Sequence, residues 1–471
     1  MGGPDLSART AEKLTAVADR MKSALGDKAV RFGDEVSDDY YADESLHAAK
    51  VSPGLLVIPT STAQVADIVR IAAETRTPVT ARGAGTGLSG ACIPDAEGVL
   101  VSFEAMNSIL EVDERSHAAV VQPGVTLAEL DVAAAAAGLV FPVHPGTDSA
   151  SLGGNLSTNA GGMAAVRYGV TRHHVLGAEA VLGTGEVVRS GGRFVKVSSG
   201  YDLTQLLVGS EGTLALITEA TLKLHPRLTA TTTLLAAFES VDDVTAVIPE
   251  LISTGVEPTT CEYIDRGTMK GLRAQNDLTL AIPAEVEAKT GAYLVVVLEG
   301  RIQSRVDEDA ELVAELLANA GAFDVYGLLS GQGAELLAAR ENAFWLVKAA
   351  GADDLIDLVV PRQAIPEYIR RTAEIGRAHG TRVFGCGHAG DGNIHFSIYQ
   401  SDEEIRSATI KEIFAMGLSL GGAISGEHGI GRAKKSYFQA LEDPAKLALQ
   451  RRIKAAFDPA GILNPGCIFD P

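Results

Sequence analysis

One stretch of the chain decides the fold: Arg82-Gly83-Ala84-Gly85-Thr86-Gly87-Leu88-Ser89-Gly90-Ala91-Cys92-Ile93-Pro94. Its spacing Gly85-x-Gly87-x-x-Gly90 matches a dinucleotide-binding fingerprint, with Glu111 about twenty residues further on. That fingerprint needs a helix that begins at the loop, so that the helix N-terminus meets the pyrophosphate. Pro94 and Gly98 prevent a helix of useful length here. We therefore predict that the loop joins strand to strand, which excludes a Rossmann fold.

A second run of small residues favours a nucleotide ligand: Pro145-Gly146-Thr147-Asp148-Ser149-Ala150-Ser151-Leu152-Gly153-Gly154-Asn155-Leu156-Ser157-Thr158-Asn159-Ala160-Gly161-Gly162. Few of these side chains are bulky, so a flat ligand can lie against the backbone while Ser, Thr and Asn donate hydrogen bonds. Backbone N–H groups in such loops also form concave anion sites. One loop alone would be explained as an ordinary glycine-rich turn, but two such loops in a β-rich region suit an extended dinucleotide.

The periodicity along the chain predicts an α+β protein. Residues 1–46 are expected to form a helical lead-in, because Leu14, Val17, Met21 and Leu25 recur at helical spacing. The next part is expected to hold strands at 55–58, 99–103, 109–113, 118–122, 178–182, 186–190 and 214–218, with helices at 62–75 and 126–137. Later strands at 292–298, 355–360, 383–388 and 394–398 alternate with helices at 241–253 and 307–320, and further helices are expected at 401–420 and 444–457. This order predicts a second domain in which helices cover a sheet.

The sequence His388-Ala389-Gly390-Asp391-Gly392-Asn393-Ile394-His395 predicts a metal site. A two-residue type I′ turn at Asp391-Gly392 would place His388 directly opposite His395, with Cβ atoms about 4.5–5.5 Å apart. Two imidazoles at that separation can share a metal ion. In Gly426-Glu427-His428-Gly429, Glu427 would add an oxygen ligand and His428 would remain a free base. Hydrolytic zinc enzymes use the same ligand set, so the metal alone does not name the reaction.

The bulk composition narrows the class of protein. The 471 residues carry a formal net charge of −20, which argues against nucleic acid as a partner. The four cysteines form no Cys-x-x-Cys pair, which suits a reducing cytoplasm and excludes a cysteine-ligated iron–sulfur cluster within the chain. Cys386, near His388, is expected to be a buried, inert thiol. No apolar stretch of about 18 residues is present. We therefore expect a cytoplasmic protein whose membrane contact, if any, is peripheral at the inner membrane face.

Six motifs in order carry a resemblance to a known family. Besides the two glycine-rich stretches, they are Arg167-Tyr168-Gly169, Gly209-Ser210-Glu211-Gly212-Thr213, the His388–His395 hairpin with Gly426–Gly429, and Asn464-Pro465-Gly466. Together they resemble the FAD-linked oxidases of the vanillyl-alcohol-oxidase or PCMH type. The nearest branch is similar to the D-2-hydroxyacid dehydrogenases, namely D-lactate dehydrogenase, D-2-hydroxyglutarate dehydrogenase and the flavin subunit of glycolate oxidase. The resemblance covers roughly residues 45–471.

The resemblance implies an α+β fold in three parts after the lead-in. These are a PCMH-type FAD-binding domain at 47–228, an α+β substrate or cap domain with an antiparallel sheet at 229–420, and a C-terminal helical segment at 421–471 that completes the active site. FAD is expected to bind non-covalently, because no His occurs between Val79 and Gly90; His144 is the remaining candidate for covalent attachment.

The implied FAD-binding residues come from both loops, from an adenine–ribose side and from the C-terminal end. They are Arg82, Gly83, Ala84, Gly85, Thr86, Gly87, Leu88, Ser89, Pro145, Gly146, Thr147, Ser151, Gly153, Gly154, Asn155, Ser157, Thr158, Asn159, Gly162, Tyr168, Gly169, Glu211, Gly212, Ile217 and Asn464.

The resemblance also implies the chemistry. A divalent metal, zinc or manganese, would bind His388, His395 and Glu427, and both histidines would contact substrate. His428 would take the hydroxyl proton of a D-2-hydroxyacid while the Cα hydride passes to flavin N5. Arg340 is expected to bind the substrate carboxylate and to act with His428 in catalysis, because a guanidinium binds carboxylates bidentately. Arg362 is a second candidate, and for both arginines a surface salt bridge is the alternative.

Two departures from the hydroxyglutarate enzymes bear on the substrate. Leu355 stands where they carry a lysine, and Ser397 stands where they carry an asparagine. Both changes favour D-lactate or glycolate, and longer apolar hydroxyacids would also fit. D-2-hydroxyglutarate dehydrogenase and the flavin subunit of a multi-subunit glycolate oxidase remain alternatives, as do an oxygen-dependent oxidase and a metal-dependent hydrolase.

The motifs do not encode the electron acceptor or the assembly state. The acceptor stays open between an electron-transfer flavoprotein, a quinone, a cytochrome and a partner subunit, and a homodimer is compatible with the sequence.

Overall fold

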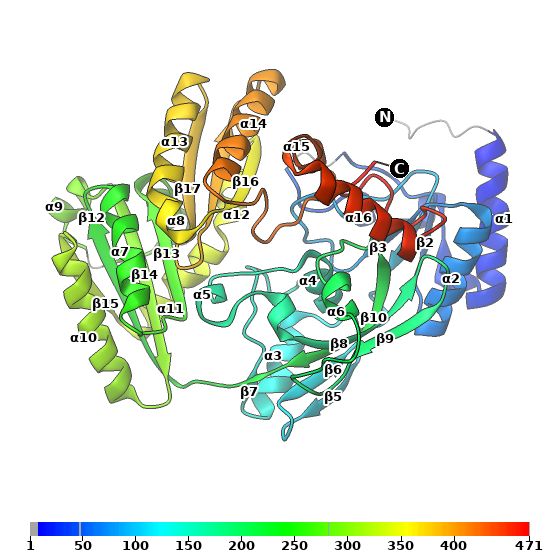
Figure 1. Ribbon diagram of the computed structural model, residues 1–471, viewed down its shortest axis with the longest axis horizontal. Helices are drawn as coiled ribbons and strands as arrows, with labels where there is room; N and C mark the ends of the chain where they lie inside the picture. The colour runs from blue at the N-terminus through cyan, green and yellow to red at the C-terminus, as the bar shows by residue number, and fades with distance from the viewer. Residues whose placement is uncertain (1–7, 47–48, 281, 471) are drawn as a thin grey trace.

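Two bodies of sheet lie side by side in the computed structural model, which describes residues 8–46, 49–280 and 282–470 (Figure 1). The first body holds a four-stranded and a five-stranded sheet, and the second holds one seven-stranded sheet. Helix α16 (Pro444–Phe457) returns to the first body at the end of the chain, whereas α15 (Lys435–Leu441) packs Tyr437, Phe438 and Leu441 against the core of the second. The architecture is the predicted α+β class.

The four-stranded sheet contains the loop that decides the fold. Its order is β1-β2-β4-β3, with strands at Val30–Arg31, Leu55–Val57, Val99–Ser102 and Val79–Arg82. Strands β3 and β4 are parallel, and the glycine-rich residues between them form no helix. The prediction of a strand-to-strand loop is therefore confirmed. Helix α2 (Thr62–Thr75) covers this sheet, as does α1 (Ala8–Leu25), whose Leu14, Val17 and Met21 are buried in the same core.

The five-stranded sheet is antiparallel, and the second glycine-rich stretch packs against it through Leu152 and Leu156. Its order is β5-β6-β10-β8-β9, at Ile109–Asp113, Ala118–Val121, Ala215–Lys223, Val175–Leu182 and Val187–Gly191. Thr126 and Glu129 form a capping box that begins α3 (Leu127–Ala136). The second stretch is not a loop throughout, because α4 (Leu152–Thr158) forms within it. Ser151 caps that helix by accepting a hydrogen bond from Gly154 N at 3.3 Å.

The seven-stranded antiparallel sheet is buried on both faces. Its order is β15-β12-β14-β13-β17-β18-β16, at Asp324–Leu328, Ala230–Phe238, Ala292–Gly300, Thr260–Asp265, Arg382–His388, Asn393–Tyr399 and Asp354–Val359. One face packs on α7 (Val241–Ser253), α10 (Gln303–Asn319), α13 (Ile365–Ala378) and α14 (Glu403–Ser419). The other face packs on α8 (Arg266–Asn276), α11 (Ser330–Glu341) and α12 (Ala343–Ala349). The site described below lies on this second face.

The predicted register of the His hairpin is wrong. His388 pairs with Asn393, and His395 pairs with Cys386, so the turn has four residues, 389–392, instead of two. The longer turn forms because its backbone has partners of its own. Gly392 N donates to His388 O at 3.0 Å, and Gly390 N donates to Cys261 O on the neighbouring strand β13 at 3.1 Å. The two histidines are therefore diagonal neighbours on one sheet face, and their ring centroids lie 5.1 Å apart.

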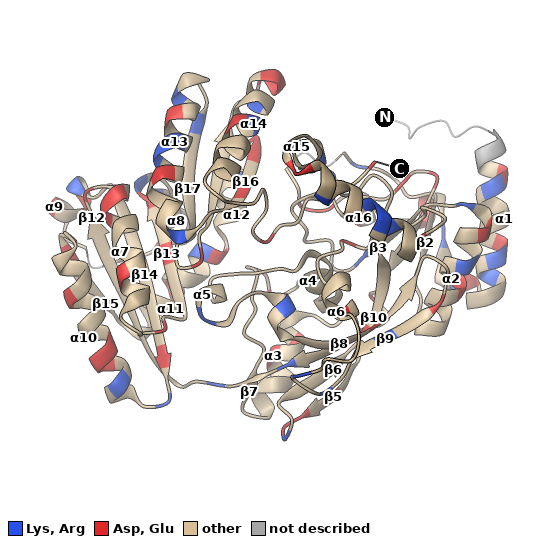
Figure 2. Ribbon diagram, in the orientation of Figure 1, with Lys and Arg blue, Asp and Glu red and all other residues tan. Residues whose placement is uncertain are grey.

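The remaining short elements include three α-helices and two strands, β7 and β11, that pair as a two-stranded antiparallel sheet. They are α5 (Ala165–Tyr168), α6 (Leu203–Leu207), α9 (Ala284–Lys289), β7 (Leu139–Val140) and β11 (His225–Pro226). Acidic and basic residues are interspersed along the helices and do not gather into a single basic face in the view of Figure 2. Among the described residues, no helix is long and apolar enough to cross a membrane.

Candidate active site

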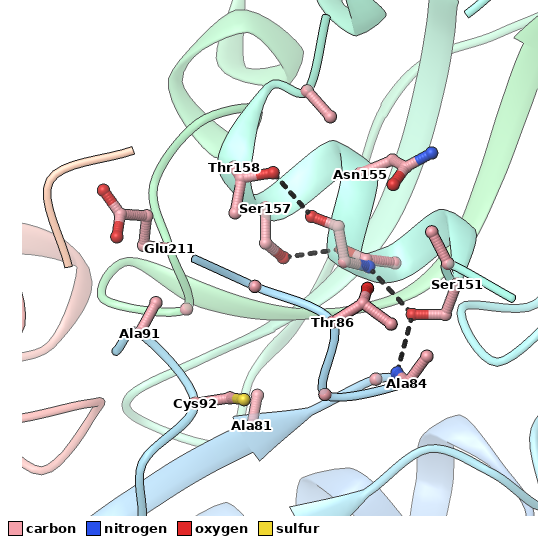
Figure 3. A pocket seen from close by; sticks show the side chains of 18 of the residues that line it. Ala81, Ala84, Thr86, Ala91, Cys92, Ser151, Asn155, Ser157, Thr158 and Glu211 are labelled. Atoms are coloured by element: carbon pink, nitrogen blue, oxygen red, sulfur yellow. Dashed lines mark hydrogen bonds between the residues drawn. The ribbon is translucent and has the colours of Figure 1, made fainter. Parts of the chain in front are cut away.

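A cleft runs between the two glycine-rich stretches. Ser151 Oγ ties the two together, since it accepts hydrogen bonds from Ala84 N at 3.2 Å and from Gly154 N at 3.3 Å (Figure 3). The predicted cofactor residues that line the cleft are Gly83, Ala84, Gly85, Thr86, Gly87, Leu88, Pro145, Thr147, Ser151, Gly153, Gly154, Asn155, Ser157, Thr158, Glu211, Gly212 and Ile217.

The cleft fits a dinucleotide by its shape and by its free donors. A Cβ on Gly83 would lie 2.0 Å from Ser151 Oγ, so only glycine permits this approach of the two stretches. The Asn155 side chain lines the cleft, and its Nδ2 is buried without a hydrogen bond to any described residue. A buried donor without a partner is costly, which indicates that a ligand completes its hydrogen bonding. The residues present therefore fit FAD.

Several predicted cofactor residues lie outside this cleft. Arg82 points away from it and donates to the backbone carbonyls of Asp39 at 2.6 Å and Ala42 at 2.8 Å. Ser89 donates to a backbone carbonyl of the C-terminal segment, and Asn464 donates to backbone carbonyls behind the cleft wall. Those side chains brace the loops, and the structure does not bring them to the cleft. The other predicted residues outside it are Gly146, Asn159, Gly162, Tyr168 and Gly169, of which Gly146 and Gly162 line a second cavity.

Glu211 links the flavin cleft to the C-terminal segment. Its carboxylate accepts hydrogen bonds from Ile430 N at 2.8 Å and Gly431 N at 2.7 Å. Burial raises the pKa of this carboxyl, while the two backbone donors act in the opposite direction. A Cβ on Gly429 would lie 2.9 Å from Glu211 Oε1, so the loop that carries Glu427 and His428 is held close against the cleft.

A second, smaller cavity adjoins the cleft. Both spaces are lined by Leu88, Pro145, Glu427 and His428. The second cavity is also lined by Arg340, His388, His395 and His144. Three sequence segments far apart in the chain thus bring most of the predicted catalytic and metal-binding residues to the wall next to the flavin cleft.

Three imidazoles converge on one carboxylate oxygen. Oε1 of Glu427 lies 3.2 Å from Nε2 of His388, 3.3 Å from Nε2 of His395 and 3.8 Å from Nε2 of His428. The rings of His395 and His428 are stacked, with centroids 5.1 Å apart and planes 8° apart. The predicted trio of His388, His395 and Glu427 is therefore assembled despite the shifted register, with His428 beside it.

Two buried acids, Glu262 and Asp357, face the Nδ1 atoms of the histidines, and neither was predicted from the sequence. Glu262 Oε1 contacts Nδ1 of His388 at 2.6 Å. Asp357 lies 3.6 Å from Nδ1 of His395 and 3.7 Å from Nδ1 of His428. A carboxylate behind a metal-binding imidazole fixes its tautomer and its orientation. The signal in the sequence was a lone acid inside an apolar strand, between Cys261 and Tyr263 in one case and between Ile356 and Leu358 in the other.

The donor set fits a divalent metal ion. Ligand atoms of Asp357, His395, Glu427 and His428 lie within 4.8 Å of one another. Asp357 is less suited to bind an ion directly, because it accepts hydrogen bonds from His428 N at 2.8 Å and Ser425 Oγ at 2.7 Å. His388, His395 and Glu427 leave nitrogen and oxygen atoms facing one point, as a zinc-type site requires.

The protonation of the cluster follows from burial and neighbouring charge. Burial lowers the pKa of His428 to about 4, although Asp357 acts in the opposite direction, so this ring is neutral near pH 7. Burial alone would raise the pKa of Glu427, but the His388 and His395 rings lower it well below its usual value. Burial raises the pKa of Cys386, which keeps its thiol protonated. A neutral imidazole beside an ionised carboxylate can accept a proton.

The two predicted substrate arginines differ in their position relative to the second cavity and in the donors that they leave free. Arg340 is buried in the second cavity, where its Nη2 lies 2.8 Å from Glu262 Oε2 and its Nε makes no hydrogen bond with any described residue. Arg362 is not among the described lining residues, and its Nε donates to Gly390 O at 2.5 Å. Arg362 therefore supports the His hairpin turn, and Arg340 is the one that offers free donors to an anionic ligand.

A dinucleotide cleft beside a buried His–Glu cluster defines a two-domain flavin-dependent oxidoreductase, and the sequence comparisons agree. Residues 53–191 match the family model described as FAD binding domain, and residues 227–468 match that of the FAD linked oxidases, C-terminal domain. The chain belongs to the FAD-linked oxidases.

Relatives cover nearly the whole chain. An uncharacterized FAD-linked oxidoreductase of Mycobacterium tuberculosis is 50% identical over 96% of this chain and 98% of that protein. The D-lactate dehydrogenase of Archaeoglobus fulgidus is 37% identical over 91% of this chain and 95% of its own. Among solved structures, 4-ethylphenol oxidase from Gulosibacter chungangensis superposes with a TM-score of 0.78 at 20% identity, covering 99% of this chain and 98% of that one. This likeness confirms the predicted PCMH-type fold.

Proposed function

We propose that this protein oxidises a D-2-hydroxy monocarboxylic acid to the 2-oxoacid, with non-covalent FAD in the cleft and zinc or manganese at His388, His395 and Glu427. One observation carries the proposal. The Nε2 atoms of three histidines converge on Glu427 Oε1, at 3.2 to 3.8 Å, in the cavity of Arg340, and Glu427 and His428 of this cluster also line the flavin cleft. The names of the D-lactate dehydrogenase relatives support the same substrate class.

Different side chains bind the substrate carboxylate, accept the hydroxyl proton and orient the base. Arg340 binds the substrate carboxylate, and its pairing with Glu262 holds the guanidinium in place. His428 is neutral because burial lowers its pKa, and it takes the hydroxyl proton at Nε2. Asp357 faces Nδ1 of the same ring and accepts a hydrogen bond from its backbone, which fixes its orientation. When bound, FAD supplies the two-electron acceptor and the metal ion supplies a Lewis acid at the substrate hydroxyl.

An anaerobic titration of the purified protein tests the proposal. D-lactate, L-lactate, glycolate and D-2-hydroxyglutarate are added while the visible flavin band is recorded. We expect the D-monocarboxylate to bleach the band. His428→Ala should slow bleaching by about 10²–10⁴-fold without loss of flavin, because it removes the general base. His379→Ala, on the surface of the second domain, is the matched control and should not slow it.

The same preparation tests the metal. Elemental analysis of the wild type should find zinc or manganese, and Glu427→Gln should lower that content while the flavin stays bound. A protein without a flavin band after FAD is supplied would refute the flavin assignment. A flavin that no hydroxyacid reduces would refute the substrate class. Reduction by D-2-hydroxyglutarate alone would favour the dicarboxylate alternative.

A further inference from the structure

The second cavity is polar at one end and apolar at the other. His388, His395 and Arg340 form the polar end. The opposite end is lined by Phe344 and Val347 of α12, by Leu355 of β16 and by Phe384 of β17. D-lactate has only a methyl group to place beyond its reacting carbon, so it would leave this end of the cavity without contacts.

The strand register explains why the chemistry changes along the cavity. His395 pairs with Cys386 on one side and with Asp357 on the other. Two residues further along β18, Ser397 pairs with Phe384 and with Leu355. Side chains two positions apart share a sheet face and lie about 7 Å apart. A row with apolar side chains at Phe384 and Leu355, on either side of Ser397, therefore follows the polar row on the same face, at a distance that a methyl group cannot span.

The apolar space continues beyond this row. A third, smaller cavity is lined by Leu88, Phe344 and Leu355, which also line the second. It adds the apolar side chains of Ile410 and Phe414 from α14. The two spaces meet at Leu355 and Phe344, so a flexible chain that passes between these side chains gains further apolar contact.

The charges along this path disfavour an acidic side chain. Lys434 lines the third cavity, but its Nζ lies 3.4 Å from Asp357 Oδ2 and donates to Gly429 O at 3.2 Å. His144 and Glu341 also line the second cavity, and Glu341, 3.4 Å from the ring, together with Asp148, at 2.9 Å, raises the pKa of His144 to about 9. That cation is therefore already paired with two carboxylates, whereas Arg340 has an Nε without a hydrogen bond to any described residue and is the better placed to bind a substrate carboxylate.

Resting on the proposed function, we infer that the substrate is a D-2-hydroxyacid with an apolar side chain of about four carbons or more, straight, branched or aromatic. The carboxylate binds Arg340, the hydroxyl faces the His–Glu cluster, and the side chain runs over Leu355 and Phe384 towards the third cavity. Each methylene buried there adds binding free energy.

A homologous series tests this. Anaerobic stopped-flow measurements of flavin reduction compare D-lactate, D-2-hydroxybutanoate, D-2-hydroxyhexanoate, D-3-phenyllactate and D-2-hydroxyglutarate. The second-order rate constant should rise about threefold to fourfold per added methylene, and so at least tenfold from lactate to hydroxyhexanoate. A rate constant for lactate equal to or above that for hydroxyhexanoate overturns the inference but leaves the proposed function standing. A rate constant for hydroxyglutarate above those of all the monocarboxylic acids overturns both in favour of the dicarboxylate alternative. Reduction by none of the acids refutes the proposed function instead.

A larger side chain at position 355 tests where the substrate side chain lies. Leu355→Phe narrows the passage between the two cavities and should lower the ratio of hydroxyhexanoate to lactate rate constants at least fivefold. It should also weaken binding of 2-oxohexanoate relative to pyruvate, measured by perturbation of the flavin spectrum. Leu312→Phe, the same exchange at an exposed position of α10, is the control and should change neither ratio. Unchanged ratios in folded Leu355→Phe would overturn the path, and the wild-type series decides the case if that variant does not fold.

Discussion

The flavin cleft and the His–Glu cluster face each other, yet they are built in opposite ways. The cleft uses backbone and small side chains, and its shape depends on atoms that are missing, such as a Cβ at Gly83. The cluster uses buried ionisable side chains, each held by another, as Glu262 holds both His388 and Arg340. We therefore expect the cleft to lose FAD binding when atoms are added to its glycines. We expect the cluster to lose stability and activity when a charge or a hydrogen bond is removed.

The largest expected effect comes from breaking a buried charge pair of the cluster. Arg340→Met removes one of the two cationic partners of the fully buried Glu262, His388 being the other, and breaking a buried pair costs up to about 3–5 kcal/mol. We expect that loss in the free energy of unfolding, measured by urea denaturation, together with the loss of saturation by substrate. Arg370→Met is the control, because Arg370 pairs with Glu367 and Glu374 in solvent and should contribute little. Equal losses in the two variants would contradict the comparison.

The cluster was partly predictable from the sequence and partly not. His388, His395, Glu427 and His428 could be found because their residue types carry the chemistry. The register of the hairpin could not, because the turn is decided by a hydrogen bond to Cys261 on a strand more than a hundred residues away. Long-range pairing of this kind leaves no local pattern.

The cleft shows the same division between local and distant information. Its glycines predicted that two backbone segments lie close together, and Pro94 after the first loop excluded the helix that a Rossmann fold requires. The side chain of Arg82 could not be placed, because its partners are the carbonyls of Asp39 and Ala42 in an irregular segment. An arginine beside glycines suggests a phosphate ligand, whereas backbone carbonyls about forty residues away in the sequence give no signal.

An intermediate effect should arise from a buried histidine in the flavin half. Burial lowers the pKa of His174 to about 4, whereas an unfolded histidine titrates near about 6.5. The unfolded chain binds this proton first, so the stability is lost as the pH falls from 6.5 to 4, by up to about 3 kcal/mol. His174→Gln should reduce the difference between the free energies of unfolding at pH 7 and pH 4.5. His379→Gln, at a partly exposed surface position of the second domain, should leave that difference as in the wild type, and an unchanged difference in His174→Gln would refute the assignment.

The smallest expected effect tests the claim that the cleft is defined by missing atoms. Gly83→Ala places a Cβ 2.0 Å from Ser151 Oγ, so either the two stretches separate or the hydroxyl rotates and loses its hydrogen bonds with Ala84 N and Gly154 N, at a cost of about 1–3 kcal/mol. The dissociation constant of FAD, measured by fluorescence after flavin removal, should rise about tenfold to a hundredfold, with the metal content unchanged. Gly87→Ala in the same loop is the matched control, because its Cβ would meet only Asp43 Oδ2 at 3.5 Å, an ordinary contact. If both variants weaken FAD equally, the flavin itself contacts the loop at each glycine, and the close approach of Ser151 does not set the width of the cleft.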